Sequence, residues 1–258
     1  MTKRSRSTMS NGKYPVVFFA VLIIVWQCIS SFGLVPAFML PSPVAVAKAF
    51  VTDLPLLAMH SVTTLGEAAL GLALSVVMAV LFAVLMDRFA AVKKTLYPVA
   101  VVTQTVPTIA VAPLLVLWMG YGVAPKIAVI FITCFFPVLI GLYGGLSSVE
   151  PAMLRLMKSM GATYLQMLTH VKFPYALGAF FSGLRISATY AVVGAVISEW
   201  LGGNSGLGVY MTRVRKGYAF DKMFAVIILI TIISLVLIRL VDALHRALTP
   251  WERAKSER

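Results

Sequence analysis

The segment that decides the fold is Gly145–Pro174, GLSSVEPAMLRLMKSMGATYLQMLTHVKFP, which is polar in a chain that is otherwise apolar. Apolar residues recur through it at spacings of three and four, a pattern typical of one helix face. Gly161 interrupts the pattern and permits a sharp turn, and Pro174 is expected to end the second helix. We therefore predict two short helices joined at Gly161, with an apolar face formed by Met153, Leu156, Met157, Met160, Tyr164, Met167 and Leu168.

The composition predicts an all-α membrane protein. Of the 258 residues, 60% are hydrophobic and only 12% are charged, whereas about a quarter of a soluble domain is charged. Because a membrane span needs roughly 20 apolar residues, the chain has room for about six transmembrane helices and for no soluble catalytic domain.

The positive charge of the chain predicts its topology. The formal net charge is +13, and lysine and arginine collect in cytoplasmic loops. Most of them lie at the N-terminus, in Asp87–Thr95, in Gly145–Pro174 and in the tail, so both termini are predicted to be cytoplasmic. The basic residues of Leu201–Lys222 oppose this topology. Basic residues do not alternate with aromatic ones, so nucleic acid is not an expected partner.

The chain is expected to be a multi-pass protein of the cytoplasmic membrane, with the lipid bilayer around its spans. Its expected organisation has three parts. Residues 1–60 comprise a basic segment, a first span and a short surface helix; a cleaved signal peptide is the alternative for that span. Residues 61–245 form the transmembrane domain, and residues 246–258 form a basic cytoplasmic tail. The expected spans are 14–35, 65–86, 96–119, 126–146, 176–200 and 223–240.

The third expected span contains the first candidate functional residues, Thr103, Gln104 and Thr105. Two prolines follow them within the same apolar run, and backbone groups that a proline frees in a membrane need new partners. This pattern favours a helix that lines a translocation path. The alternative is a kinked packing helix in which Gln104 bonds to a neighbour.

Ionisable residues within apolar segments are functional candidates by default. Glu199, at the end of the fifth expected span, is therefore added to the translocation path. The alternative is a structural pair with Arg213 or Arg215. Glu67, near the start of the second span, is expected at the membrane interface.

Catalytic, metal and cofactor sites are not predicted. The three histidines, at 60, 170 and 245, lie at span ends or in loops, which does not suit an intramembrane serine protease. The chain has no HExxH motif and no GxxxxGK[ST] phosphate loop. The two cysteines lie inside apolar runs and form no metal-binding or disulfide pattern.

The polar segment resembles the EAA loop of ABC-importer permeases. In that loop a Glu-Ala-Ala precedes a glycine by a few residues, and Ile-x-Leu-Pro follows. Gly161, Ala162 and Pro174 match, Val171 and Phe173 are conservative replacements, and the Glu-Ala-Ala positions hold Arg155, Leu156 and Met157.

The resemblance extends to further segments, which look like permeases of the nitrate, sulfonate and taurine branch. Within that branch, GAVISEWLGG followed by GLGVYMTR is most similar to permeases for thiamine-pyrimidine precursors. The segments are Ser182–Arg185, Glu199–Gly202 and Gly206–Tyr210.

The resemblance implies a type I ABC importer permease fold that imports a small solute. The implied solute is a thiamine pyrimidine precursor, with sulfonate, taurine and nitrate also open. The implied partners are cytoplasmic ATPases that carry ATP and Mg, an extracytoplasmic substrate-binding protein and a second permease copy. A coupling loop at 147–174 would contact the ATPase through Arg155, Leu156, Met157, Met160, Gly161, Ala162 and Pro174.

Two alternatives remain at this point. The polar segment could instead rest on the inner leaflet as an amphipathic hairpin. The chain could also be a secondary transporter driven by an ion gradient, although the inverted repeats and buried carboxylates usual in that class are not evident.

Overall fold

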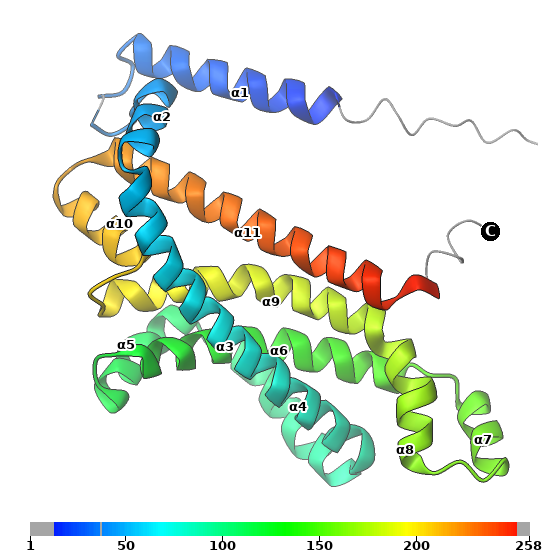
Figure 1. The fold of residues 1–258 in the computed structure, drawn as a ribbon. Helices are drawn as coiled ribbons and strands as arrows, with labels where there is room; N and C mark the ends of the chain where they lie inside the picture. The colour runs from blue at the N-terminus through cyan, green and yellow to red at the C-terminus, as the bar shows by residue number, and fades with distance from the viewer. Residues whose placement is uncertain (1–12, 37, 252–258) are drawn as a thin grey trace, which may run out of the picture. The chain divides into compact units, whose positions relative to one another are not determined.

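The protein is described by a computed structural model that covers residues 13–36 and 38–251, and these residues form helices and no strand (Figure 1). The predicted basic N-terminus and most of the tail at 246–258 lie outside the described residues. The helices are α1 (Lys13–Ser31), α2 (Pro43–Thr52), α3 (Leu54–Arg88), α4 (Ala90–Gln104), α5 (Thr108–Met119), α6 (Val123–Ser147), α7 (Pro151–Ser159), α8 (Tyr164–Met167), the π-helix η1 (Leu168–Lys172), α9 (Phe173–Leu201), α10 (Leu207–Lys216) and α11 (Phe220–Leu248).

The predicted number of membrane spans is confirmed. Within the described residues five helices are long and apolar enough to cross a membrane, and α4 with α5 would make a sixth. α3 has 35 residues and begins earlier than the expected span at 65, and α11 extends beyond the expected end at 240. Polar residues continue both helices past their apolar parts, which hydropathy does not detect.

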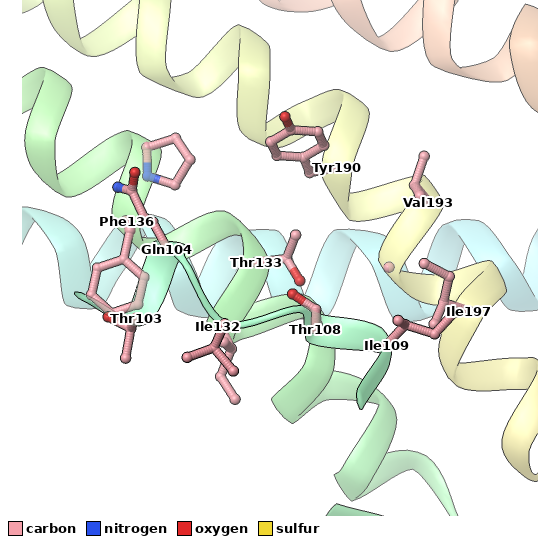
Figure 2. Close-up of a pocket in the computed structure, with 13 residues that line it drawn as sticks. Thr103, Gln104, Thr108, Ile109, Ile132, Thr133, Phe136, Tyr190, Val193 and Ile197 are labelled. Atoms are coloured by element: carbon pink, nitrogen blue, oxygen red, sulfur yellow. The ribbon is translucent and has the colours of Figure 1, made fainter. Parts of the chain in front are cut away.

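The prediction of one continuous span at 96–119 is wrong in its geometry. α4 and α5 meet at an angle of 105°, and the break falls at residues 105–107 (Figure 2 shows the residues that flank it). Pro107 precedes α5 in an extended conformation, with φ −63° and ψ 112°. A proline has no N–H to continue a helix and disfavours a helical conformation in the residue before it, so the helix stops here.

The chain divides into two compact units, of which the first comprises the residues up to Leu57 together with Met211–Ile228. Within it, the indole N–H of Trp26 donates to the carbonyl oxygen of Pro41 at 3.0 Å. The Lys222 Nζ lies 2.8 Å from the Asp53 Oδ2. The apolar residues of α1 are exposed around most of the helix, as expected for a helix that contacts lipid.

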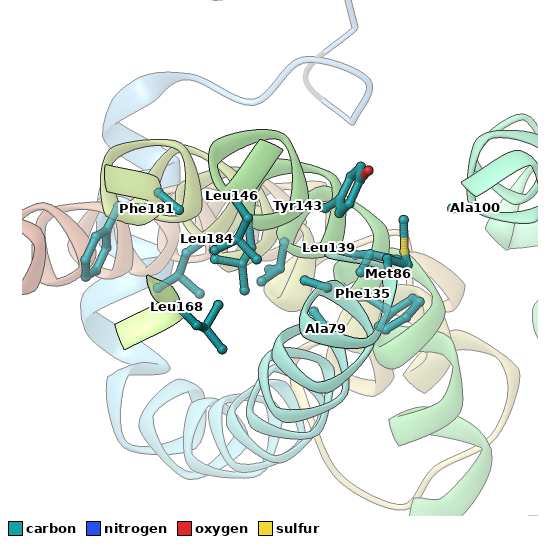
Figure 3. Packing of buried hydrophobic residues seen from close by; sticks show 14 residues of the cluster. Ala79, Met86, Ala100, Phe135, Leu139, Tyr143, Leu146, Leu168, Phe181 and Leu184 are labelled. Atoms are coloured by element: carbon teal, nitrogen blue, oxygen red, sulfur yellow. The ribbon is translucent and has the colours of Figure 1, made fainter. Parts of the chain in front are cut away.

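The second unit comprises Ala58–Tyr210 and the residues from Leu229 onward, and its core is built on α6 and α9 (Figure 3). These two helices approach closely because small residues face each other. A Cβ atom on Gly145 would lie 2.7 Å from the Cα of Ala176, and one on Gly183 would collide with the carbonyl oxygen of Pro137. The large side chains that fill the core around this contact include Phe135, Leu139, Leu142, Leu146, Phe181 and Leu184.

We expect Gly145→Ala to destabilise the protein by about 1–3 kcal/mol, because an added methyl group forces the two helices apart. Gly144→Ala is the matched control, since nothing lies within 4 Å of a Cβ atom at Gly144. The measurement is thermal unfolding of both variants in the same detergent. Equal melting temperatures for the two variants would show that the contact does not limit packing.

Candidate functional site

The turn of the polar segment is a helix ending built on Gly161. After α7, Gly161 adopts φ +83°, a left-handed conformation that favours glycine. Its N–H donates to the carbonyl oxygen of Lys158 at 3.0 Å, and the N–H of Ala162 donates to that of Met157 at 3.0 Å. This pair of bonds is the Schellman motif. The predicted turn at Gly161 is confirmed.

The second arm begins with a capping box at Thr163. The backbone N–H of Thr163 donates to the side chain of Gln166 at 2.8 Å, and the Gln166 N–H donates to the Thr163 hydroxyl at 3.4 Å. Each side chain therefore satisfies a backbone donor that the start of a helix leaves free. The two local motifs, at Gly161 and Thr163, fix the shape of the hairpin.

The prediction that Pro174 ends the second helix is wrong. α8 continues through η1 into α9, and the N–H of Phe173 donates to the carbonyl oxygen of Leu168, five residues back. This wider turn places Pro174 in the first turn of α9. Proline has no N–H to donate to the preceding turn, and the π-helix accommodates this missing donor without ending the helix.

The predicted apolar face of the hairpin is divided between core and surface. Leu168 is buried, and Met157, Tyr164 and Met167 are partly buried. Met153 and Leu156 of α7 and the C-cap residue Met160 lie on one face and are 48%, 61% and 75% exposed, and Leu165 of α8 is 66% exposed. Of the other predicted coupling residues, Arg155 and Gly161 are exposed, and Ala162 and Pro174 are partly buried.

A cavity of about 510 Å³ opens beside the break between α4 and α5 (Figure 2). Thr103 and Gln104 line it, together with residues of α5, α6 and α9. Its polar lining comes from Thr103, Gln104, Thr108, Thr133 and Tyr190, and the rest is apolar. Within the described chain the Gln104 amide makes no hydrogen bond, so the alternative of a bond to a neighbouring helix is not seen.

Thr105 and Glu199, the other two residues predicted for the path, are not among those that line this cavity. Thr105 lies in the break, and its hydroxyl donates to the carbonyl oxygen of Val102 at 2.7 Å. Glu199 lies near the end of α9 and is 2% exposed.

The Glu199 carboxylate caps the start of α10. Its Oε2 accepts the N–H of Gly208 at 2.6 Å, and its Oε1 accepts the hydroxyl of Thr64 at 2.7 Å. The Thr64 hydroxyl in turn accepts the N–H of Leu207 at 2.8 Å. A carboxylate suits this position because free N–H groups and the helix dipole favour negative charge.

One neighbouring hydrogen bond completes this cap. The N–H of Gly206 donates to the Nδ1 of His60 at 3.0 Å. Gly206 has φ +122°, and a Cβ atom on it would collide with the Glu199 carboxylate. Sequence reasoning missed this role of Glu199. The signal that could have revealed the cap is the glycine-rich run Gly202–Gly208, which directly precedes a helix.

Arg213 and Arg215 belong to the first unit, so the alternative pairing of Glu199 with them stays a prediction.

A buried ion pair lies in the same unit. The Nζ of Lys126 is 2.6 Å from the Oε1 of Glu67, and the two side chains are each 7% exposed. Glu67 is enclosed by protein, and its expected level at the membrane interface stays a prediction. Its charge is balanced by a lysine 59 positions away in the chain, a contact that sequence spacing does not reveal.

Comparison with known proteins decides the family. Residues 71–254 match the family described as "Binding-protein-dependent transport system inner membrane component". The chain belongs to this family of ABC transporter permeases. The permease is therefore a multi-pass membrane subunit of the type I class, as the sequence predicted.

Curated relatives cover most of the permease. A probable ABC transporter permease of Haemophilus influenzae is 39% identical over 233 residues, which is 90% of this chain and 95% of the relative. The formylaminopyrimidine transport permease ThiX of Halalkalibacterium halodurans is 35% identical, over 93% of this chain and 96% of ThiX. The taurine transport permease TauC of Escherichia coli is 30% identical, over 90% of this chain and 87% of TauC.

A solved structure has the same fold. The permease aligns with a chain from the crystal structure of an amino acid ABC transporter with histidines, with a TM-score of 0.63 and 17% sequence identity. The alignment covers 76% of this chain and 96% of that one.

Proposed function

We propose that the permease imports a small solute in a complex driven by separate ATPase subunits. In this proposal the ATPases bind ATP and Mg and hold the hairpin at 147–174 on the cytoplasmic side. An extracytoplasmic binding protein delivers the solute, and a second copy of the permease completes a homodimer. Family membership supports this arrangement in general.

The single observation that carries the proposal is the exposed apolar surface of the hairpin. Leu156 and Met160 are more than half exposed on a hairpin whose shape is fixed at both ends of its turn. Exposed apolar side chains gathered on one face mark a surface that a partner covers. A short amphipathic helix of this kind fits a groove on another protein. Movement of that groove when ATP closes the ATPase dimer would displace the hairpin.

The lining of the cavity favours an uncharged, heterocyclic solute. None of its 13 lining residues is Asp, Glu, Lys, Arg or His, while hydroxyl groups, one amide and the rings of Phe136 and Tyr190 are present. An anion such as a sulfonate or nitrate would lose its hydration here without a compensating charge. A pyrimidine offers a flat face and several hydrogen-bonding edges. Similarity to ThiX agrees with a pyrimidine precursor as the solute.

In this proposal Thr103 and Gln104 contact the solute, and Thr105 belongs to the path through its place in the break. In the same proposal Glu199 does not contact the solute. It supports transport indirectly, by keeping α10 in position.

We expect Gln104→Leu to lower the uptake of radiolabelled formylaminopyrimidine by about tenfold, because one polar edge of the solute loses its partner. The measurement is initial uptake by cells that express the whole transporter. Gln27→Leu, the same change in the first unit, is the control and is expected to leave uptake unchanged. Normal uptake by Gln104→Leu would remove Gln104 from the path. Excess unlabelled taurine should not compete; competition by taurine would contradict the uncharged solute.

A further inference from the structure

Asp87, the residue before the last in α3, contacts both ends of the second arm of the hairpin. The Lys172 Nζ lies 2.7 Å from its Oδ1 and 2.8 Å from its Oδ2. The Tyr164 hydroxyl donates to its Oδ2 at 2.9 Å. Tyr164 is the first residue of α8 and Lys172 is the last residue of η1. One carboxylate therefore binds side chains from both ends of this arm.

These contacts are largely shielded from water. The side chains of Asp87 and Lys172 are 6% and 13% exposed. The Arg88 guanidinium stacks over the Tyr164 ring, 4.6 Å from its centroid. Cation–π contacts and charged hydrogen bonds both strengthen when water is excluded. Removing one partner of such a pair leaves an uncompensated buried charge, which is strongly unfavourable.

Neither the turn nor the helix start needs these contacts. The Schellman motif at Gly161 and the capping box at Thr163 already satisfy the local backbone groups. The Asp87 contacts instead join the hairpin to a helix more than 75 positions earlier in the chain. The end of α3 is thus held to the second arm of the hairpin by an ion pair and a hydrogen bond.

Near its beginning in the second unit, α3 contributes two residues, His60 and Thr64, to the cap of α10. His60 and Thr64 accept the N–H groups of Gly206 and Leu207, and Thr64 also donates to Glu199. α3 is continuous from these residues to Asp87, a separation of about 40 Å along a helix with a rise of 1.5 Å per residue. Between the two ends, Ala79, Ala83 and Met86 are buried in the core of the unit.

We propose that Asp87 is a positioning residue that clamps the hairpin to α3, so that displacement of the hairpin reaches the α10 cap through α3. This inference rests on the proposed function, in which an ATPase displaces the hairpin. Movement would then follow two routes, directly along the chain into α9 and across the Asp87 clamp into α3. Loss of the clamp would weaken the link between ATP hydrolysis and transport without preventing the ATPase from binding.

The test uses the whole transporter, purified with its ATPase and placed in proteoliposomes with radiolabelled formylaminopyrimidine. The variants are Asp87→Asn, Tyr164→Phe and the exchanged pair Asp87→Lys with Lys172→Asp. Asp242→Asn is the matched control, because Asp242 accepts Arg185 Nε at 2.8 Å in a more exposed ion pair that includes no residue of the hairpin. Three quantities are measured: ATPase retained, ATP hydrolysed and solute imported per ATP.

We expect Asp87→Asn to retain the ATPase and to import about tenfold less solute per ATP, an ordinary size for coupling between two sites. Tyr164→Phe, which keeps the ring and loses one hydrogen bond, is expected to fall between Asp87→Asn and the wild type. The exchanged pair is expected to recover import per ATP above Asp87→Asn, and Asp242→Asn to match the wild type.

Two results would overturn the inference. The first is import per ATP in Asp87→Asn and Tyr164→Phe equal to that of the wild type. The second is a parallel loss of bound ATPase, hydrolysis and import that the exchanged pair does not reverse, since that indicates a purely structural role. Failure of the proposed function is distinguishable, because the wild-type permease would then retain no ATPase at all.

Discussion

Replacing both Leu156 and Met160 with aspartate is expected to abolish ATP-driven uptake while the permease still folds. The two side chains are 61% and 75% exposed, so the fold of the chain does not depend on burying them. A partner that covers them gains about 1.5–3 kcal/mol for each, and a charge in its groove forfeits that gain. The affinity for the ATPase should therefore fall by at least about a hundredfold, at 1.4 kcal/mol for each factor of ten.

The measurement is the amount of ATPase that co-purifies with a tagged permease, together with uptake by the same cells. Lys158→Glu is the matched control, because Lys158 lies on the opposite side of α7 and the substitution also adds negative charge. It should leave both quantities near the wild-type level. Full retention of the ATPase by the double variant would remove Leu156 and Met160 from the contact.

Gly206→Ala is expected to cause the largest loss of stability among single substitutions in the α10 cap. Gly206 has φ +122°, and the new Cβ atom would collide with the buried Glu199 carboxylate. The backbone strain costs about 1–3 kcal/mol. Displacing the carboxylate also weakens its hydrogen bonds to Gly208 and Thr64, each worth about 1.5–3 kcal/mol.

The measurement is thermal unfolding in detergent. Gly120→Ala is the control, since Gly120 also has a positive φ, +76°, but nothing lies within 4 Å of a Cβ atom there. Gly206→Ala should melt well below Gly120→Ala, and adding Glu199→Ala should cost less in that background than in the wild type. Equal melting of the two glycine variants would show that the carboxylate does not constrain Gly206.

Hydropathy and local motifs are enough to predict the number of spans and the turn of the hairpin. The bilayer requires long apolar helices, so the presence of a span is evident from its own residues. The turn at Gly161 is equally local, because it depends on one left-handed glycine and two bonds to carbonyl oxygens of the preceding helix. Such features need no knowledge of distant parts of the chain.

The features that sequence reasoning missed depend on distant residues or on backbone geometry. The capping role of Glu199 is not predicted because its partners in the cap, Thr64 and Gly208, are not evident from the sequence around it. Proline usually stops a helix, so the sequence predicts a helix end at Pro174, and the π-helix that accommodates this residue has no simple sequence signal. The 105° bend at residues 105–107 exceeds an ordinary proline kink.

The most direct test of the central claim is uptake by proteoliposomes that contain the purified permease with or without its ATPase. Each preparation receives ATP and Mg, or an ion gradient without nucleotide, and the binding protein loaded with radiolabelled formylaminopyrimidine. Our account predicts uptake only when the ATPase and ATP are both present. Uptake by the permease without the ATPase, driven by the ion gradient, would contradict it.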